Sequence, residues 1–94
     1  MYIFEIIDKS GRQIRLSKER WAHIRMEHPE ITDYEEIIAA LANPLKINSS
    51  FYNPDSIKWY YKFDKKKNRY LMVAVKYLNG EGFVITSYYM RNIK

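Results

Sequence analysis

Two histidines, His23 and His28, stand five positions apart in a segment that ends at Pro29, and they are the only histidines in the chain. Histidine is the one side chain whose unperturbed pKa lets it both give and accept a proton near neutral pH. The pair belongs to an acidic half of the chain that precedes a basic, aromatic half. This combination predicts acid-base chemistry on an anionic substrate, and the alternative is that one or both histidines are ordinary helix residues.

The spacing of the pair argues against a metal site. On an ideal helix, positions five apart differ in direction by about 140°, so His23 and His28 do not share a face. The His-Glu-x-x-His pattern of zinc-binding helices does not occur in the sequence. We therefore expect no metal and no other cofactor, and we expect the two histidines to occupy unequal positions.

His28 is the better catalytic candidate of the two. It shares a narrow arc with Trp21 and Ile24 and precedes a proline, so it is expected at the end of a helix, beside the core or its edge. There it suits a general acid if it borders a cleft, and the structural alternative is that it caps the last helical turn. His23 lies nearer Glu27 and is expected to face solvent.

The second half of the chain is basic and aromatic. Residues 1–44 hold six Lys or Arg and eight Asp or Glu, a net charge of −2, whereas residues 45–94 hold ten and three, a net charge of +7. The second half also holds eleven of the fifteen aromatic residues. Basic groups interleaved with aromatic ones suit a phosphate backbone and stacked bases, which indicates RNA as a partner. Strand cores and a solvated turn at Lys65-Lys66-Lys67 account for part of the same pattern.

Length and composition narrow the class of protein. Ninety-four residues form a single domain, 1–94, that can bury one modest core. The chain has no cysteine, which excludes a disulfide framework, a thiol nucleophile and a cysteine-based zinc site, and which fits a reducing cytoplasm. No apolar run approaches the length of a membrane span, and the first residues lack the basic region of a signal peptide, so no membrane association is expected.

The first part of the pattern predicts a hairpin followed by a helix. Strands are expected over Tyr2–Asp8 and Arg12–Leu16, joined by the turn Lys9-Ser10-Gly11. Ser17 is expected to cap a helix over Lys18–Glu27 that carries an acidic residue in its first turn.

The remainder predicts a second helix and four strands. Asp33 and Glu36 resemble a capping box at the start of the helix, and Asn43-Pro44 ends it. The apolar stripe of this helix consists of Tyr34, Ile37, Ile38, Leu41 and Ala42. The expected strands cover Leu45–Tyr52, Ser56–Phe63, Tyr70–Tyr77 and Gly82–Met90. Their turns are Asn53-Pro54-Asp55, Lys65-Lys66-Lys67-Asn68 and Asn79-Gly80-Glu81.

These elements define an expected fold class. Short turns make consecutive strands antiparallel neighbours. The fold class is therefore expected to be α+β, with an N-terminal hairpin and two α-helices packed on one face of a four-stranded antiparallel sheet.

Alternation along the strands divides the expected sheet into two faces. The residues expected to face the helices are Ile57, Trp59, Tyr61, Phe63, Leu71, Val73, Val75, Tyr77, Phe83, Ile85, Ser87 and Tyr89. The opposite face then gathers lysines and hydroxyl groups from Tyr60, Lys62, Lys76, Thr86 and Tyr88. A register slip of one residue exchanges the two sets, and the alternative to a functional surface is an ordinary solvated sheet face.

A basic, hydroxyl-rich sheet face suits a phosphate. RNA supplies its own nucleophile, the 2′-hydroxyl. A metal-independent ribonuclease needs one group to remove the 2′ proton, one to protonate the leaving 5′ oxygen, and cations to stabilise the charge on phosphorus. Histidine, lysine, arginine and tyrosine fill these roles without a cofactor, so the sequence predicts a metal-independent RNA endonuclease.

Several segments together resemble a known family. They are Leu16-Ser17-Lys18-Glu19-Arg20-Trp21-Ala22-His23-Ile24, Glu27-His28-Pro29-Glu30, Leu41-Ala42-Asn43-Pro44, Tyr60-Tyr61-Lys62, Val73-Ala74-Val75-Lys76 and Val84-Ile85-Thr86-Ser87-Tyr88. With these segments, the chain from Leu16 onward resembles the small phage- and mobile-element-associated proteins grouped with barnase–EndoU–colicin–RelE-like nucleases. That resemblance implies a RelE-like fold and nuclease activity.

The resemblance also implies roles for particular residues. Those matching catalytic positions are His28, His23, Lys62, Thr86 and Tyr88. Those expected to bind substrate are Lys76, Tyr60 and Arg91. The chain departs from barnase-like sites because the expected active strands carry no paired glutamate and histidine. A toxin-like module of this kind would be neutralised by an antitoxin or immunity-type protein partner.

The alternative function is a non-catalytic module of the same fold that binds RNA or another protein. This alternative predicts salt-sensitive RNA binding, or capture of a partner, without turnover.

Overall fold

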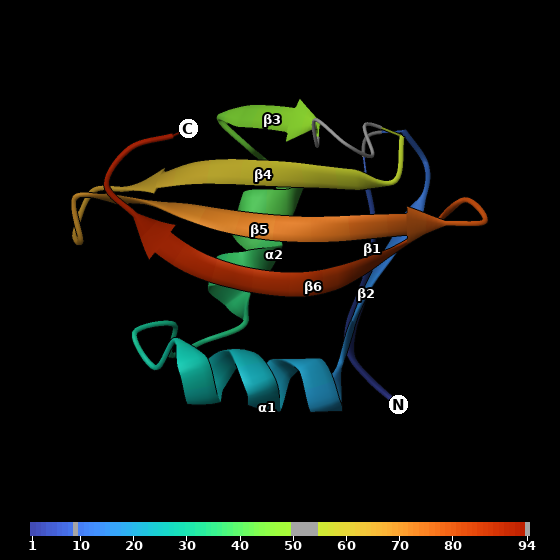
Figure 1. Cartoon of the computed structure of the whole chain (residues 1–94), viewed down its shortest axis with the longest axis horizontal. Helices are drawn as coiled ribbons and strands as arrows, with labels where there is room; N and C mark the ends of the chain where they lie inside the picture. The colour runs from blue at the N-terminus through green and yellow to red at the C-terminus, as the bar shows by residue number, and fades with distance from the viewer. Residues whose placement is uncertain (9, 50–54, 94) are drawn as a thin grey trace.

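The chain forms one sheet with two helices (Figure 1). The computed structural model describes residues 1–8, 10–49 and 55–93. The elements are, in chain order, β1 (Tyr2–Ile7), β2 (Gln13–Ser17), α1 (Lys18–Glu27), α2 (Glu35–Ala42), β3 (Lys46–Ser49), β4 (Ile57–Asp64), β5 (Arg69–Leu78) and β6 (Glu81–Met90). The expected α+β class is confirmed. Lys9 and residues 50–54, where part of two predicted turns and the end of one predicted strand fall, lie outside the described residues.

The sheet is larger than expected and is mixed. Among the described residues it has six strands in the order β1-β2-β6-β5-β4-β3. The last four strands of the chain pair antiparallel, as their short turns predicted. The prediction of a separate hairpin beside a four-stranded antiparallel sheet is wrong, because β2 joins β6 as a parallel neighbour through the pairs Ile14–Gly82 and Arg15–Phe83. No local sequence pattern predicts this pairing, because the two strands are far apart in the sequence.

The two helices occupy different places on the sheet. Figure 1 shows α2 behind β4 and β5, which it contacts, and α1 along the border formed by β6 and β2. The expectation that both helices lie across one face therefore holds for α2, whereas α1 follows the edge of β6. No helix in the described part of the chain is long and apolar enough to cross a bilayer.

Local signals fix both ends of α1. The Ser17 side chain accepts a hydrogen bond from the Arg20 N–H at 3.1 Å, as predicted for an N-cap. The helix ends at His28, whose backbone N–H donates to the Ile24 carbonyl at 2.7 Å. Pro29 follows and cannot extend the helical hydrogen-bond pattern.

Asp33 and Glu36 form hydrogen bonds at the start of α2, although the N-cap residue is Tyr34 and the Asp33 side chain bonds one residue earlier than in the predicted capping box. The Glu36 carboxylate accepts a hydrogen bond from the Asp33 N–H at 3.2 Å, and the Asp33 carboxylate accepts one from the Glu35 N–H at 2.9 Å. These bonds satisfy backbone donors that a helix start leaves unpaired. Ile37, Ala40 and Leu41 are then buried against the sheet, so α2 covers the central strands.

The larger apolar core lies between the sheet and the helices. Its buried members are Phe4, Ile14, Leu16, Ile24, Ile31, Ile37, Ala40, Leu41, Tyr60, Leu71, Val73, Val75, Tyr77 and Val84. The predicted core face of β5 is confirmed. The predicted core face of β4 is wrong, because Tyr60 faces the helices and its neighbour Tyr61 packs on the other side.

The opposite face of the sheet, here called the outer face, carries a second apolar cluster. Its members are Tyr61, Met72, Ala74, Trp59, Ile85, Tyr88, Met90 and Ile93. A register shift between Ala74 and Val75 places an extra residue in β6, since Ala74 pairs with Thr86 whereas Val75 pairs with Val84. The prediction that Ile85 and Phe83 face the helices is therefore wrong, and the side chains of Thr86 and Tyr88 belong to the outer face, as predicted.

Gly82 permits β2 to approach β6. A Cβ atom built on Gly82 would lie 2.8 Å from the Tyr77 ring, 3.0 Å from the Val75 side chain and 3.1 Å from the Ile14 side chain. The Tyr77 ring cannot easily retreat, because its hydroxyl lies 2.5 Å from the Tyr60 hydroxyl and donates to Asp8 at 2.9 Å. Glycine is therefore required at position 82 for β2 and β6 to pair.

Asp8 ties the hairpin turn to the core. Its carboxylate accepts hydrogen bonds from the Ser10 N–H at 2.8 Å, the Arg12 N–H at 2.9 Å and the buried Tyr77 hydroxyl at 2.9 Å. Burial works to raise the pKa of Asp8, but the hydrogen bonds from Ser10, Arg12 and Tyr77 outweigh it and hold the pKa below its ordinary value. The ionised carboxylate therefore stabilises the folded state.

Replacing Gly82 with Ala is expected to lower the free energy of unfolding by about 1–3 kcal/mol, because the added methyl group overpacks a site whose neighbours are held in place. Urea denaturation monitored by circular dichroism measures the change. Leu78→Ala, at an exposed position of the adjoining strand, is the control and should cost clearly less. A Gly82→Ala variant as stable as the wild type would contradict the requirement for glycine.

Asp8→Asn is expected to lower the free energy of unfolding at pH 7 by about 1–3 kcal/mol, the range for a charged hydrogen-bonded group. Because the folded-state pKa lies below the unfolded value of about 3.9, the wild-type advantage is present above that pH and disappears as the pH falls through the folded-state pKa. Urea denaturation at pH 7 and at acid pH tests this convergence, with the exposed Asp55→Asn as control. A pH-independent difference would contradict it.

Candidate functional site

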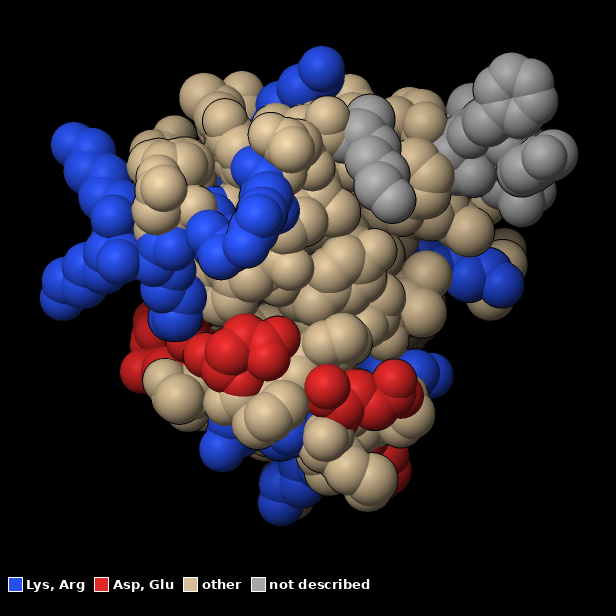
Figure 2. Space-filling view, turned by 60° about the vertical axis from the view of Figure 1, so that its left-hand side comes forward, with Lys and Arg blue, Asp and Glu red and all other residues tan. Residues whose placement is uncertain are grey.

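The outer face is the part of the sheet that no helix covers. Figure 1 shows β4, β5 and β6 in front of α2, with the C-terminal segment curving back beside them. Ile93 from that segment packs on the outer cluster. Figure 2 shows Lys and Arg gathered at one side of the molecule, next to Asp and Glu. The members of the outer cluster itself are all uncharged.

The end of α1 brings His28 to the outer face. Its ring centroid lies 5.2 Å from that of Tyr88, with an angle of 37° between the ring planes. The His28 side chain is 28% exposed, so it contacts the sheet and still reaches solvent. Nδ1 lies 3.6 Å from a carboxylate oxygen of Glu30.

Thr86 extends the pair along β6. Thr86 and Tyr88 are alternate residues of one strand, paired with Ala74 and Met72 of β5, so they share the outer face about 7 Å apart. The fold therefore brings His28 into contact with Tyr88, and Thr86 lies on the same face of the sheet. An imidazole and two hydroxyls on one surface provide a proton-transfer group and two hydrogen-bond donors.

His23 lies away from this group. Its ring pairs with the Glu27 carboxylate one helical turn later, and its side chain is 51% exposed. This is the solvent-facing position that the helical spacing predicted. His23 lines a shallow depression at the start of α1 with Ser17, Glu19 and Arg20 and does not face the outer cluster.

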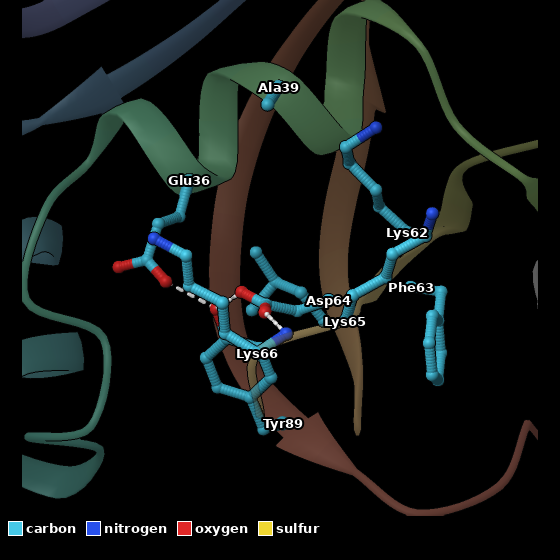
Figure 3. Close-up of a pocket in the computed structure, with 9 residues that line it drawn as sticks. Glu36, Ala39, Lys62, Phe63, Asp64, Lys65, Lys66 and Tyr89 are labelled. Atoms are coloured by element: carbon cyan, nitrogen blue, oxygen red, sulfur yellow. Dashed lines mark hydrogen bonds between the residues drawn. The ribbon is translucent and has the colours of Figure 1, made fainter. Parts of the chain in front are cut away.

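Two further predicted site residues, Tyr60 and Lys62, lie on the helix side of the sheet. Tyr60 is buried, and its hydroxyl bonds to that of Tyr77. Lys62 lines a pocket between α2 and the β4–β5 turn (Figure 3). The prediction of one surface holding Tyr60, Lys62, Lys76, Thr86 and Tyr88 is therefore wrong. In β4, the set with Tyr60 and Lys62 faces the helices, and the set with Trp59 and Tyr61 faces the outer side.

The pocket beside Lys62 has a volume of about 380 Å³ and contains a polar network (Figure 3). The Tyr89 hydroxyl donates to the Glu36 carboxylate, and the Lys67 ammonium lies 3.1 Å from the same carboxylate. Burial works to raise the pKa of Glu36, but the hydrogen bonds from Tyr89 and Lys67 hold it below its ordinary value. Burial and the bond to Glu36 raise the pKa of Tyr89. Because Tyr89 and Lys67 already engage the Glu36 carboxylate, we assign the network to stability.

The remaining predicted residues lie at the borders of the outer face. Lys76 pairs with Phe83 and is exposed on the same face as Ala74. Arg91 is exposed directly after β6 and precedes the segment that brings Ile93 onto the outer cluster. Both cations can therefore meet a ligand that lies along the outer face.

The sequence reasoning missed the aromatic content of the outer face. Trp59 and Tyr61 were expected in the core below the helices, and both belong to the outer cluster. Burial raises the pKa of the Tyr61 phenol, which also hydrogen-bonds with Asn48, so its hydroxyl stays protonated at neutral pH. The signal was present in β4, where aromatic residues occupy both alternating sets.

The described residues contain no group of three or more His, Cys, Asp or Glu side chains arranged to hold a metal ion. Comparisons with family models, with curated proteins and with solved structures returned no match.

Trp59 is expected to report directly on ligands of the outer face. The chain has two tryptophans, so Trp21→Phe leaves Trp59 as the only one. Adding a non-cleavable single-stranded oligoribonucleotide should change the emission of this variant, because a stacked base alters the surroundings of the indole. The Trp59→Phe variant, which retains Trp21 beside Tyr34 in the helix-side core, should respond much less. Equal responses would contradict binding at this face.

Proposed function

We propose that this protein is a metal-independent RNA endonuclease whose active site lies on the outer face around His28, Thr86 and Tyr88. The observation that carries the proposal is the contact between the His28 and Tyr88 rings, 5.2 Å apart at the uncovered side of the sheet. A histidine held there reaches both solvent and any strand laid along the sheet. The setting we propose is cytoplasmic, with RNA as the substrate.

The proposed reaction is attack of the RNA 2′ oxygen on the adjacent phosphorus. A P–O2′ bond forms, the P–O5′ bond breaks, and the products end in a 2′,3′-cyclic phosphate and a 5′-hydroxyl. His28 accepts the 2′ proton and the Tyr88 hydroxyl donates a proton to the leaving oxygen. The protonated His28 then releases its proton to solvent and the Tyr88 phenolate takes one up from solvent, so no proton is gained or lost over the cycle.

Other groups of the outer face have supporting roles in this proposal. The Thr86 hydroxyl donates a hydrogen bond to a phosphate oxygen, and the Glu30 carboxylate, 3.6 Å from His28 Nδ1, stabilises the imidazolium that forms when His28 accepts the proton. Trp59, which is only partly buried, offers aromatic surface for a base next to the reacting phosphate. Tyr60, Lys62 and His23 have no part in the reaction.

The resemblance stated from the sequence supports the same proposal. The segments that carry it include His28 and the run from Val84 to Tyr88, which supply the proposed active site. We propose that the chain belongs with the barnase–EndoU–colicin–RelE-like nucleases, and that an antitoxin or immunity-type partner restrains it. A non-catalytic RNA-binding module is the second candidate, favoured by the aromatic outer cluster, and it differs by the absence of turnover.

His28→Gln is expected to lower the rate of RNA cleavage by on the order of 10²–10⁴-fold, because it removes the proton-transfer group without removing hydrogen bonding. Cleavage of a fluorescent single-stranded RNA in EDTA measures the rate, and a 2′-deoxy analogue should remain intact. His23→Gln is the matched control and should retain wild-type activity, since that side chain faces solvent. Cleavage that requires a metal or proceeds without the 2′-hydroxyl would refute the mechanism, as would full activity in the double histidine variant.

A further inference from the structure

A second concave region borders the outer face, at the opposite end of α1 from His28. It has a volume of about 520 Å³ and lies where the N-terminal hairpin crosses the sheet. Its lining includes Tyr2 of β1, Arg15 of β2, Arg20 of α1, Lys76 of β5 and Phe83 of β6. We call this region the hairpin hollow.

Two of the three cations in the hairpin hollow are free to bind a ligand. Arg15 is already engaged, because its guanidinium lies 3.1 Å from Glu81 and 3.5 Å from Glu5. The side chains of Arg20 and Lys76 make no hydrogen bond or ion pair within the described part of the chain. Two unpaired cations at one hollow favour an anionic ligand.

The walls of the hairpin hollow suit a base next to that anion. Phe83 and Ile85 supply apolar surface from β6, and Tyr2, a residue that is 40% exposed, supplies an aromatic ring. The Arg15 guanidinium lies 5.2 Å from the centre of the Tyr2 ring, which limits where that ring can move. Aromatic surface beside cations is the combination that binds single-stranded nucleic acid.

The hairpin hollow lies within reach of the same strand as the proposed active site. Arg20 and His28 are eight positions apart on or at the end of α1, about 12 Å along the helix axis. On the outer face of β6, Phe83 lines the hollow, Tyr88 contacts His28, and Thr86 lies between them along the strand. A strand that passes one site is therefore directed toward the other.

We propose that the hairpin hollow binds a flanking nucleotide of the RNA strand that is cleaved at His28, with its phosphate on Arg20 and Lys76 and its base against Tyr2 and Phe83. This inference rests on the proposed function. It predicts that the protein prefers oligonucleotides long enough to occupy both sites.

The test compares a two-nucleotide and an eight-nucleotide RNA, both 2′-O-methylated so that they cannot be cleaved, by fluorescence anisotropy. The Arg20→Gln/Lys76→Gln double variant should bind the longer RNA at least about tenfold more weakly, and the slope of log Kd against log salt should fall by about 0.7 for each lost phosphate contact. Binding of the shorter RNA should change less than twofold. On a cleavable eight-nucleotide RNA, KM should rise while kcat stays unchanged.

The matched control is Lys62→Gln/Lys65→Gln, which removes the same charge from the opposite side of the sheet and should leave the affinity near that of the wild type. An equal loss of affinity in this control would overturn the inference, because the lower net charge of the protein would then explain the weaker binding. Equal losses for the short and long RNA would also overturn it. If the wild type cleaves RNA while the Arg20/Lys76 variant binds the longer RNA normally, only this inference fails. If the wild type binds no RNA, the proposed function fails with it.

Discussion

The close approach of β2 to β6 at Gly82 is the constraint on which the rest of the structure depends. Only a residue without a side chain fits against Ile14 and Tyr77 at this point. Because α1 begins directly after Ser17, the position of β2 fixes where the helix starts and along which edge it runs. That edge is the edge of β6, and the far end of the helix consequently delivers His28 to Tyr88. A backbone contact far from the histidine therefore sets the geometry of the candidate site.

The two faces of the sheet separate stability from function. On the helix side, the buried hydroxyls of Tyr60 and Tyr77 and the carboxylate of Asp8 form one hydrogen-bonded group that joins the hairpin to the core. Such a group resists change, because removing one partner leaves another buried and unsatisfied. The outer face has no helix over it, so its aromatic and hydroxyl side chains remain accessible at the border near His28.

Net charge alone is a poor guide to where this protein would hold an anion. The lysine-rich β4–β5 turn is its most basic segment, yet Lys67 is paired with Glu36, and the adjoining pocket contains carboxylates. Arg20 and Lys76 come from distant parts of the sequence, and neither is paired with an acid among the residues that the structure describes. What matters for binding is the charge that remains after internal pairing, and this depends on the fold.

The sequence by itself determined the helices and their caps, the antiparallel order of the last four strands, and the unequal directions of His23 and His28. These features depend on neighbours in the chain. It did not determine which side of β4 meets the helices. Both alternating sets of β4 contain apolar residues, and Tyr60 and Tyr61 are both buried, at 4% and 3% exposure, so alternation alone does not tell which set faces the helices. The extra residue at Ile85 and the parallel β2–β6 pair were likewise decided by tertiary structure, since both arise from packing between strands that are not local in sequence.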